Sequence, residues 1–85
     1  MGSMNRHDRA VLNELALQPE DDPWVKLPQL RQNARLTDLE LLPSLDRLVS
    51  SGDVLHEWRV GVRGGAYRIA QESRLRANKL SGQYV

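Results

Sequence analysis

The 85-residue sequence predicts a single small α+β domain in which helices come first and a β-hairpin follows. Two observations predict this class. Apolar residues recur at helical spacing in the first half of the chain, and apolar and polar residues alternate between residues 54 and 60. Between these stretches lies Gly52, a residue that leaves a helix in the left-handed conformation at no steric cost. We therefore expect a three-helix core, a two- or three-stranded β-sheet and a short C-terminal helix.

Composition limits the remaining possibilities. Residues 1–3, which precede Met4, are typical of a cloning remnant, so we expect the domain to span residues 4–80 and residues 81–85 to form a flexible tail. The absence of cysteine excludes disulfides and thiolate metal ligands and favours a cytoplasmic protein. No apolar run approaches membrane-spanning length, so we expect no membrane partner.

The first half of the chain predicts two helices and a short strand. Asn5 or Asp8 can cap a helix that runs to about Leu17. After an acidic loop at residues 20–23, residues 24–26 predict a strand that can pair with the edge of the hairpin, and Pro28 suits the first turn of a helix over 28–34. The apolar residues expected to face the core are Val11, Leu12, Leu15, Ala16, Leu27, Leu30 and Ala34.

The third helix has the clearest pattern. Thr37 and Glu40 form a capping box, in which each side chain satisfies a free amide at the helix start. Pro43 lacks a backbone N–H, so the helix either kinks there or begins nearer Leu41. The residues expected to form its buried face are Leu41, Leu45, Leu48 and Val49.

The second half predicts a hairpin and a last helix. Residues 54–60 form the first strand, with Val54, His56, Trp58 and Val60 on one side, and Trp58 is expected to cover the core. Residues 61–65 are a flexible connection, and residues 66–70 return as the partner strand with Tyr67 and Ile69 inward. Residues 71–80 can form a short, weakly amphipathic helix.

A capped leucine-rich helix that ends at Gly52 and turns directly into a strand at Val54 resembles the winged helix-turn-helix domains of MarR- and ArsR-type regulators. The resemblance implies a small winged helix whose third helix lies in the major groove of DNA and whose hairpin, the wing, reaches phosphates. The function implied is DNA binding, by a transcriptional regulator or another nucleic-acid-binding accessory factor, with double-stranded DNA as the partner.

Charge supports an anionic partner for the second half. Residues 1–53 carry six Lys/Arg against nine Asp/Glu, whereas residues 54–85 carry six against two. Arginine contacts phosphate and base edges well, and paired glycines allow a phosphate to approach the backbone closely. The candidate nucleic-acid-binding residues are Arg59, Arg63, Gly64, Gly65 and Arg68 on the wing, Arg47 and Ser44 on the third helix, and Lys26; Arg31 and Arg35 are further candidate phosphate contacts.

The outward positions of the third helix favour an alternative, a protein-interaction module such as an adaptor or a subunit of a larger assembly. Carboxylates repel phosphate, and leucines offer little to a base edge. The residues of this apolar and acidic face are Asp38, Leu39, Glu40, Leu42 and Pro43, and a protein partner or a second copy would cover them. In a third arrangement, Leu39 or Leu42 packs against the second helix or near Trp24 and leaves no patch.

Reactive groups do not converge in the sequence. His7 and His56 lie in different predicted elements, and the paired carboxylates sit in a loop and at a helix start, where capping explains them. The glycines at 61–65 join two strands, whereas a phosphate-cradling loop opens a helix. We therefore expect no enzymatic activity, no cofactor and no metal site.

Overall fold

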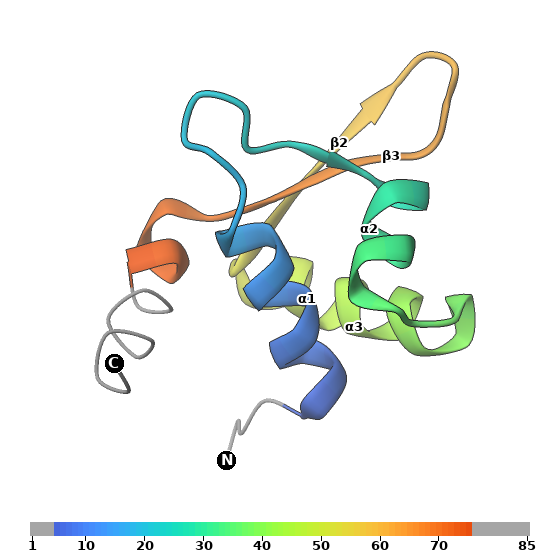
Figure 1. The fold of residues 1–85 in the computed structure, drawn as a ribbon, viewed down its shortest axis with the longest axis horizontal. Helices are drawn as coiled ribbons and strands as arrows, with labels where there is room; N and C mark the ends of the chain where they lie inside the picture. The colour runs from blue at the N-terminus through green and yellow to red at the C-terminus, as the bar shows by residue number, and fades with distance from the viewer. Residues whose placement is uncertain (1–4, 76–85) are drawn as a thin grey trace.

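The computed structural model describes residues 5–75 and shows three helices on one side of a small sheet (Figure 1). The elements in order are α1 (Arg6–Ala16), β1 (Val25–Lys26), α2 (Leu27–Ala34), α3 (Asp38–Ser51), β2 (Val54–Arg59) and β3 (Val62–Ile69). Residues 71–75 are also helical. The predicted winged-helix order is thus confirmed. The predictions for residues 1–4, for the rest of the C-terminal helix and for the tail lie outside the described residues.

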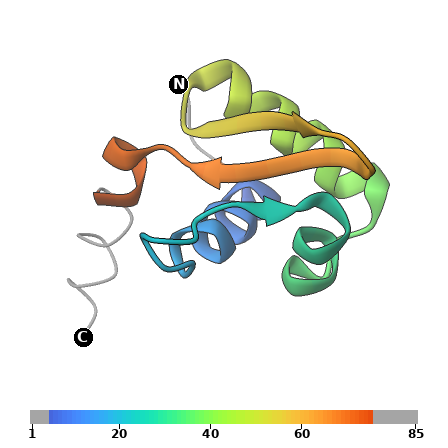
Figure 2. The same cartoon turned by 90° about the horizontal axis from the view of Figure 1, so that it is seen from above.

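The sheet is antiparallel and has the order β1–β3–β2 (Figure 2). Tyr67 of the central strand β3 lies opposite Val25 on one side and opposite His56 on the other. The two-residue strand β1 therefore pairs with the edge of the hairpin, as the sequence predicts. Tyr67 and Ile69 are buried on the face that covers the helices, also as predicted.

The core lies between α1, α3 and the sheet. Leu41, Leu45 and Leu48 of α3 are buried, and they pack in one cluster with residues of α1, α2 and all three strands. Val49 was expected to join them, but 39% of its surface is exposed. Each helical residue turns the side chain by about 100°, so Val49 points away from the face that Leu48 and Leu45 bury.

The helix ends follow local chemistry. The Asn5 side chain accepts a hydrogen bond from the Asp8 backbone N–H at 2.9 Å, so Asn5, rather than Asp8, caps α1. Gly52 ends α3 in the left-handed conformation, with φ +85°. Helix α3 begins at Asp38 and continues through Pro43, so a start nearer Leu41 is wrong. Arg35 ends α2 in the left-handed conformation, with φ +56°, which is uncommon for a residue other than glycine and was not expected.

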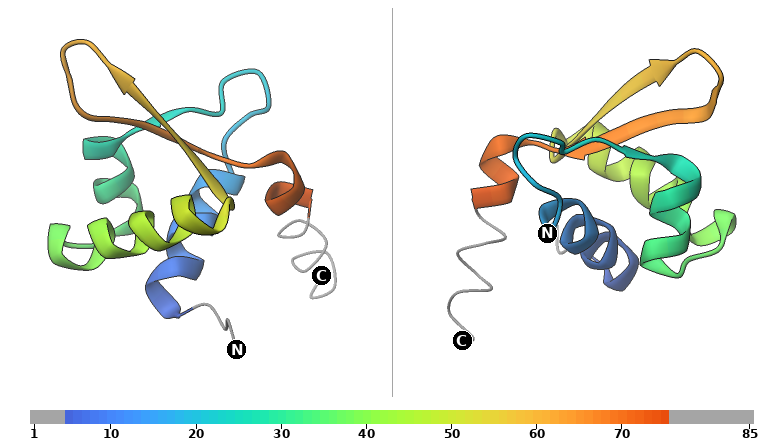
Figure 3. Two further views of the ribbon diagram at one scale, coloured as in Figure 1. Left: turned by 180° about the vertical axis from the view of Figure 1, so that it is seen from behind. Right: turned by 45° about the horizontal axis from the view of Figure 1, so that its top comes forward.

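The hairpin differs from the expectation in its connection. Only Val60 and Gly61 link β2 to β3, and residues 62–65 belong to β3, so a flexible connection over 61–65 is wrong. The register shifts between Glu57 and Arg59, which marks an irregularity in the ladder. Trp58 is 76% exposed and does not cover the core. The hairpin tip extends beyond the helices, on the side of α2 and the start of α3 (Figure 3).

Within residues 5–75, the helices are all too short or too polar to cross a membrane.

Candidate nucleic-acid interface

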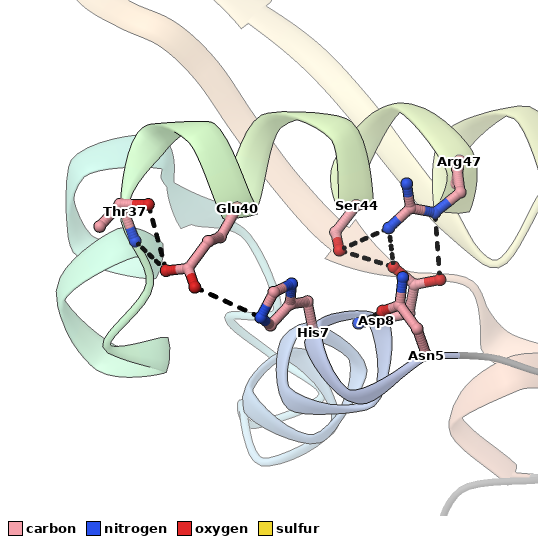
Figure 4. Close-up of polar contacts among 7 residues, drawn as sticks. All are labelled: Asn5, His7, Asp8, Thr37, Glu40, Ser44 and Arg47. Carbon is pink, nitrogen blue, oxygen red and sulfur yellow. Dashed lines mark hydrogen bonds and ion pairs between the residues drawn. The ribbon is translucent and has the colours of Figure 1, made fainter.

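The start of α3 is fixed by the predicted capping box (Figure 4). The backbone N–H and the hydroxyl of Thr37 both donate to Glu40 Oε1, at 2.9 and 3.1 Å. The other carboxylate oxygen lies 3.3 Å from His7 Nε2 on α1. Hydrogen bonds from the Thr37 backbone and hydroxyl lower the pKa of Glu40, against a smaller opposing effect of burial. Glu40 therefore serves the helix start and the junction with α1, and its carboxylate is already engaged by groups of this chain.

Two residues predicted to contact DNA, Ser44 and Arg47, form hydrogen bonds to the buried carboxylate of Asp8 on α1, although half of the Arg47 side chain stays exposed. Ser44 is fully buried, and its hydroxyl donates to Asp8 Oδ1 at 2.6 Å. Arg47 donates to both oxygens of Asp8, from Nη2 at 2.9 Å and from Nε at 3.3 Å. Placing Ser44 on the outward face is wrong, because this side chain points into the α1–α3 junction. The Arg47 guanidinium is held by a carboxylate of its own chain.

The network also sets the charge of Asp8. Burial raises the pKa of this carboxyl group, but the hydrogen bonds from Arg47 and Ser44, together with the charge of Arg47, outweigh burial and leave the pKa lowered. The same hydrogen bond raises the pKa of Arg47. Asp8 and Arg47 are thus a stable ion pair at neutral pH, and this pair joins α1 to the second half of α3.

The outward face of α3 is apolar and acidic. Leu39 is 89% exposed, and Leu42, 45% exposed, lines a hollow with residues of α2. The alternative in which one of these leucines packs away and leaves no patch is therefore wrong, because Leu39, Leu42 and Pro43 remain exposed together. Asp38 and Asp46 are the exposed carboxylates of the same helix. Among the described residues, the side chains of this face therefore do not themselves attract phosphate, although Arg31 and Arg63 lie beside Asp38 and Leu42.

Two wing arginines surround an aromatic ring on the sheet face that points away from the helices. The guanidinium carbons of Arg59 and Arg68 lie 5.6 and 5.9 Å from the centre of the Trp24 ring, within reach of a cation–π interaction. Arg59 Nε also donates to Glu57 Oε2 at 2.9 Å, and Lys26 is exposed nearby in β1. Since successive strand residues point to opposite faces, Arg68 lies on the other side of the sheet from Tyr67.

Gly64 and Gly65 have a structural reason to be glycine. A Cβ at Gly64 would lie 2.2 Å from Leu27 Cδ2, and a Cβ at Gly65 would lie 2.4 Å from the Glu57 carbonyl oxygen. Gly65 is buried, so the expectation that it admits a phosphate is wrong. These glycines let β3 pass close to α2 and β2 at the irregularity of the hairpin.

Arg63 of β3 and Arg31 of α2 lie close to the start of α3. Both are exposed, and both line an open hollow of about 350 Å³ together with Asp38 and Leu42. Arg31 Nη1 lies 3.5 Å from Asp38 Oδ1, in a solvent-exposed ion pair. Such pairs are weak in water, so the Arg31 guanidinium can exchange this partner for a phosphate at small cost.

The structure thus separates the predicted residues into two groups. Lys26, Arg59, Arg63 and Arg68 present cations on the wing and β1, whereas Ser44, Arg47, Gly64 and Gly65 serve the fold. Sequence reasoning missed the place of Trp24 between two arginines and the exposure of Asp46. The residues next to Trp24 in the sequence do not indicate that it contacts Arg59 and Arg68, which lie more than thirty residues later. Within the described residues, no group of three or more histidines and carboxylates is placed to hold a metal ion.

No protein-family model and no curated protein matches the chain. Among solved structures, the chain is similar to a MarR family transcription regulator, with a TM-score of 0.73 and 18% sequence identity. The superposition covers 96% of this chain and 54% of that chain, so this chain spans about half the length of the regulator. At this identity the likeness shows the fold: the chain has a MarR-like winged helix.

Proposed function

We propose that this protein is a winged-helix DNA-binding protein, a transcriptional regulator or an accessory factor, that holds duplex DNA mainly through its phosphates. The observation that carries the proposal is a separation of charge within the fold. Residues 24–35 and 54–69, which form β1, α2 and the wing, contain six Lys/Arg and one Glu. Residues 36–53, which form α3 and its ends, contain one Arg and four Asp/Glu.

The basic surface has two parts. Arg63 and Arg31 stand at the start of α3, below the hairpin tip, where both guanidiniums are open to solvent. Lys26, Arg59 and Arg68 lie around Trp24 on the outer face of the sheet. Arginine donates two parallel hydrogen bonds to a phosphate, so these side chains suit the backbone of a duplex. Such contacts position a protein on DNA without reading its sequence.

We do not expect α3 to read base edges. Its outward side chains are carboxylates and apolar groups, and its one arginine, Arg47, is bound to Asp8. A carboxylate near the phosphates is unfavourable unless it accepts a hydrogen bond from cytosine. We therefore expect duplexes of different sequence to bind with similar affinity and with a strong dependence on salt.

The experiment is a fluorescence-anisotropy titration of labelled duplexes of two unrelated sequences over a series of salt concentrations. Each phosphate contact contributes about −0.9 to the slope of log affinity against log salt, so Arg31→Ala with Arg63→Ala should make the slope less negative by about 1.8. Arg9→Ala removes an exposed arginine from α1 and is the matched control, for which we expect an unchanged slope. Absence of salt-dependent binding at low salt, or equal effects of the control and the double variant, would contradict the proposal.

A second candidate function, protein interaction, rests on the exposure of Leu39, Leu42 and Pro43. Soluble monomeric domains seldom leave neighbouring apolar side chains this open, and a partner or a second copy would cover them. Leu39→Ser with Leu42→Ser should abolish such an association, measured by sedimentation, without lowering the melting temperature. A variant that unfolds would show that these leucines contribute to the fold, and the candidate would be abandoned.

A further inference from the structure

An open hollow of about 590 Å³ lies between α3 and the inner face of the wing. We call it the α3–wing groove and define it by Leu42, Pro43, Asp46 and Val49 of α3 and by His56 and Trp58 of β2. Leu45 and Tyr67 complete its lining. The groove is therefore mainly apolar, and it is distinct from the outer sheet face on which Arg59, Arg68 and Trp24 lie.

Three aromatic rings give the wing side of the groove a fixed shape. The His56 ring stacks on Tyr67 with centres 4.4 Å apart and an angle of 15° between planes. Trp58 meets His56 edge to face, with centres 4.5 Å apart at 70°. His56 Nε2 lies 2.9 Å from the Gly64 carbonyl oxygen, which only accepts, so this nitrogen carries the proton and donates. Trp58 is the outermost of the three aromatic residues and is 76% exposed.

Asp46 gives the groove a negative charge. Asp46 and Tyr67 both line the groove; burial raises the pKa of Tyr67, and the charge of Asp46 raises it further. Within residues 5–75, Asp46 has no ion-pair partner, in contrast to Asp8 and Asp38. An apolar hollow beside an unpaired carboxylate suits an occupant that combines an apolar side chain with a positive charge.

The same charge disfavours two other occupants. A nucleic-acid strand would bring phosphates against Asp46, and the groove has no arginine or lysine among the residues 5–75 that line it. A second copy joined through the same groove by two-fold symmetry would place the acidic face of one α3 against that of the other. Like charges brought together at an interface oppose binding.

We propose that the α3–wing groove binds a segment of a partner protein in which an aromatic or aliphatic side chain is followed closely by a lysine or an arginine. The apolar side chain packs between Trp58 on the wing and Val49 and Pro43 on α3. The cation pairs with Asp46. This binding goes beyond contact with DNA and does not depend on it, because the groove contains none of the basic residues proposed to contact DNA and shares only Leu42 with the hollow that Arg31 and Arg63 line.

The probe is a set of peptides selected from a random displayed library on the whole protein, then synthesised and titrated by calorimetry. We expect the selected peptides to share an apolar residue followed by Lys or Arg. Trp58→Ala should weaken binding at least tenfold, and Asp46→Asn should weaken it severalfold. Leu55→Ser changes an exposed apolar residue on the outer face of the sheet and is the matched control, with unchanged affinity expected.

Several results would overturn the proposal. These are a library that yields no binding peptide, peptides without a cation, and peptides whose affinity is the same for Trp58→Ala. Trp58 and Leu42 are both exposed, so Leu42→Lys serves as a second groove variant, and circular dichroism checks that each variant is folded. If the protein self-associates and Trp58→Ala abolishes this, the occupant is a second copy. If a single-stranded oligonucleotide competes with the peptides, the occupant is a nucleic acid. Either result would contradict the proposal. An unchanged salt slope for duplex binding in Trp58→Ala separates this site from the DNA contacts.

Discussion

Helix α3 and the wing are the two parts of a winged helix that approach DNA, and in this molecule they differ in where their arginines go. The one arginine of α3, Arg47, turns inward to Asp8 and holds α3 against α1. Arg63 on the wing is exposed, and Arg59 and Arg68 lie beside Trp24 on the outer face. The cation of α3 is thus paired with a buried carboxylate, although half of its own side chain is exposed, whereas Arg59 on the wing is paired with the exposed Glu57.

The difference shows that a recognition helix is defined by its exposed side chains and not by its place in the fold. The exposed surface of α3 consists mainly of leucine, proline and aspartate, which suits a protein better than a phosphate. The wing and α2 have the opposite character. We therefore propose DNA contact and protein contact for different surfaces of one small domain, and substitutions can test each surface separately.

The largest expected effect concerns how α3 is anchored. Leu48→Ala removes a buried side chain from the α1–α3 junction and should lower the free energy of unfolding by about 2–5 kcal/mol, as measured by urea denaturation. Val49→Ala, one residue further on the exposed side, should lower it by less than about 1 kcal/mol, because surface substitutions are usually small. Equal losses at the two positions would mean that α3 turns a different face to the core.

A second substitution examines how the wing is built. Gly65→Ala forces a left-handed conformation on alanine, which costs about 1–2 kcal/mol, and also drives Cβ against the Glu57 carbonyl oxygen. Gly52→Ala at the end of α3 pays only the conformational cost, because nothing lies within 4 Å of its Cβ. Thermal melts should therefore rank Gly65→Ala as clearly less stable than Gly52→Ala. The reverse ranking would contradict the close approach of β3 to β2.

The third prediction concerns the inward arginine of α3. Asp8→Ala leaves the Ser44 hydroxyl buried without its acceptor and should cost about 1–3 kcal/mol at neutral pH. Because the folded pKa of Asp8 lies below its ordinary value of 3.8, its contribution is complete above that value and is lost as the pH falls through the folded pKa. The stability difference between wild type and Asp8→Ala should thus shrink below about pH 4. A difference that stays constant down to pH 2 would exclude the ion pair as its source.

Much of the fold could be predicted from the sequence because the patterns that indicate its helices are local. The capping box, the spacing of Leu41, Leu45 and Leu48, and Gly52 all lie within one helix and predict its bounds. The helix signals need no knowledge of distant partners. The predicted pairing of residues 24–26 with the hairpin edge, which is long-range, is confirmed for Val25 and Lys26.

The site was less accessible because its decisive contacts are distant in sequence. Asp8 lies 36 residues before Ser44, and nothing in the pattern of α3 shows that Ser44 and Arg47 face it. Two adjacent glycines, Gly64 and Gly65, are typical of a turn. In the structure they lie in β3, where Leu27 and the Glu57 backbone leave no room for a side chain. Charge counts by segment were informative, but only the fold shows which cations remain exposed.

The most direct test of the central claim is a map of backbone amide shifts by NMR as a short duplex is added to the labelled protein at low salt. We expect the largest shift changes in residues 24–31 and 59–68, on β1, α2 and the wing. The amide shifts of residues 39–49 on α3 should change little. Changes concentrated on the outward positions of α3, at Leu39, Leu42 and Asp46, would contradict the division between a basic wing that meets DNA and an acidic helix that does not.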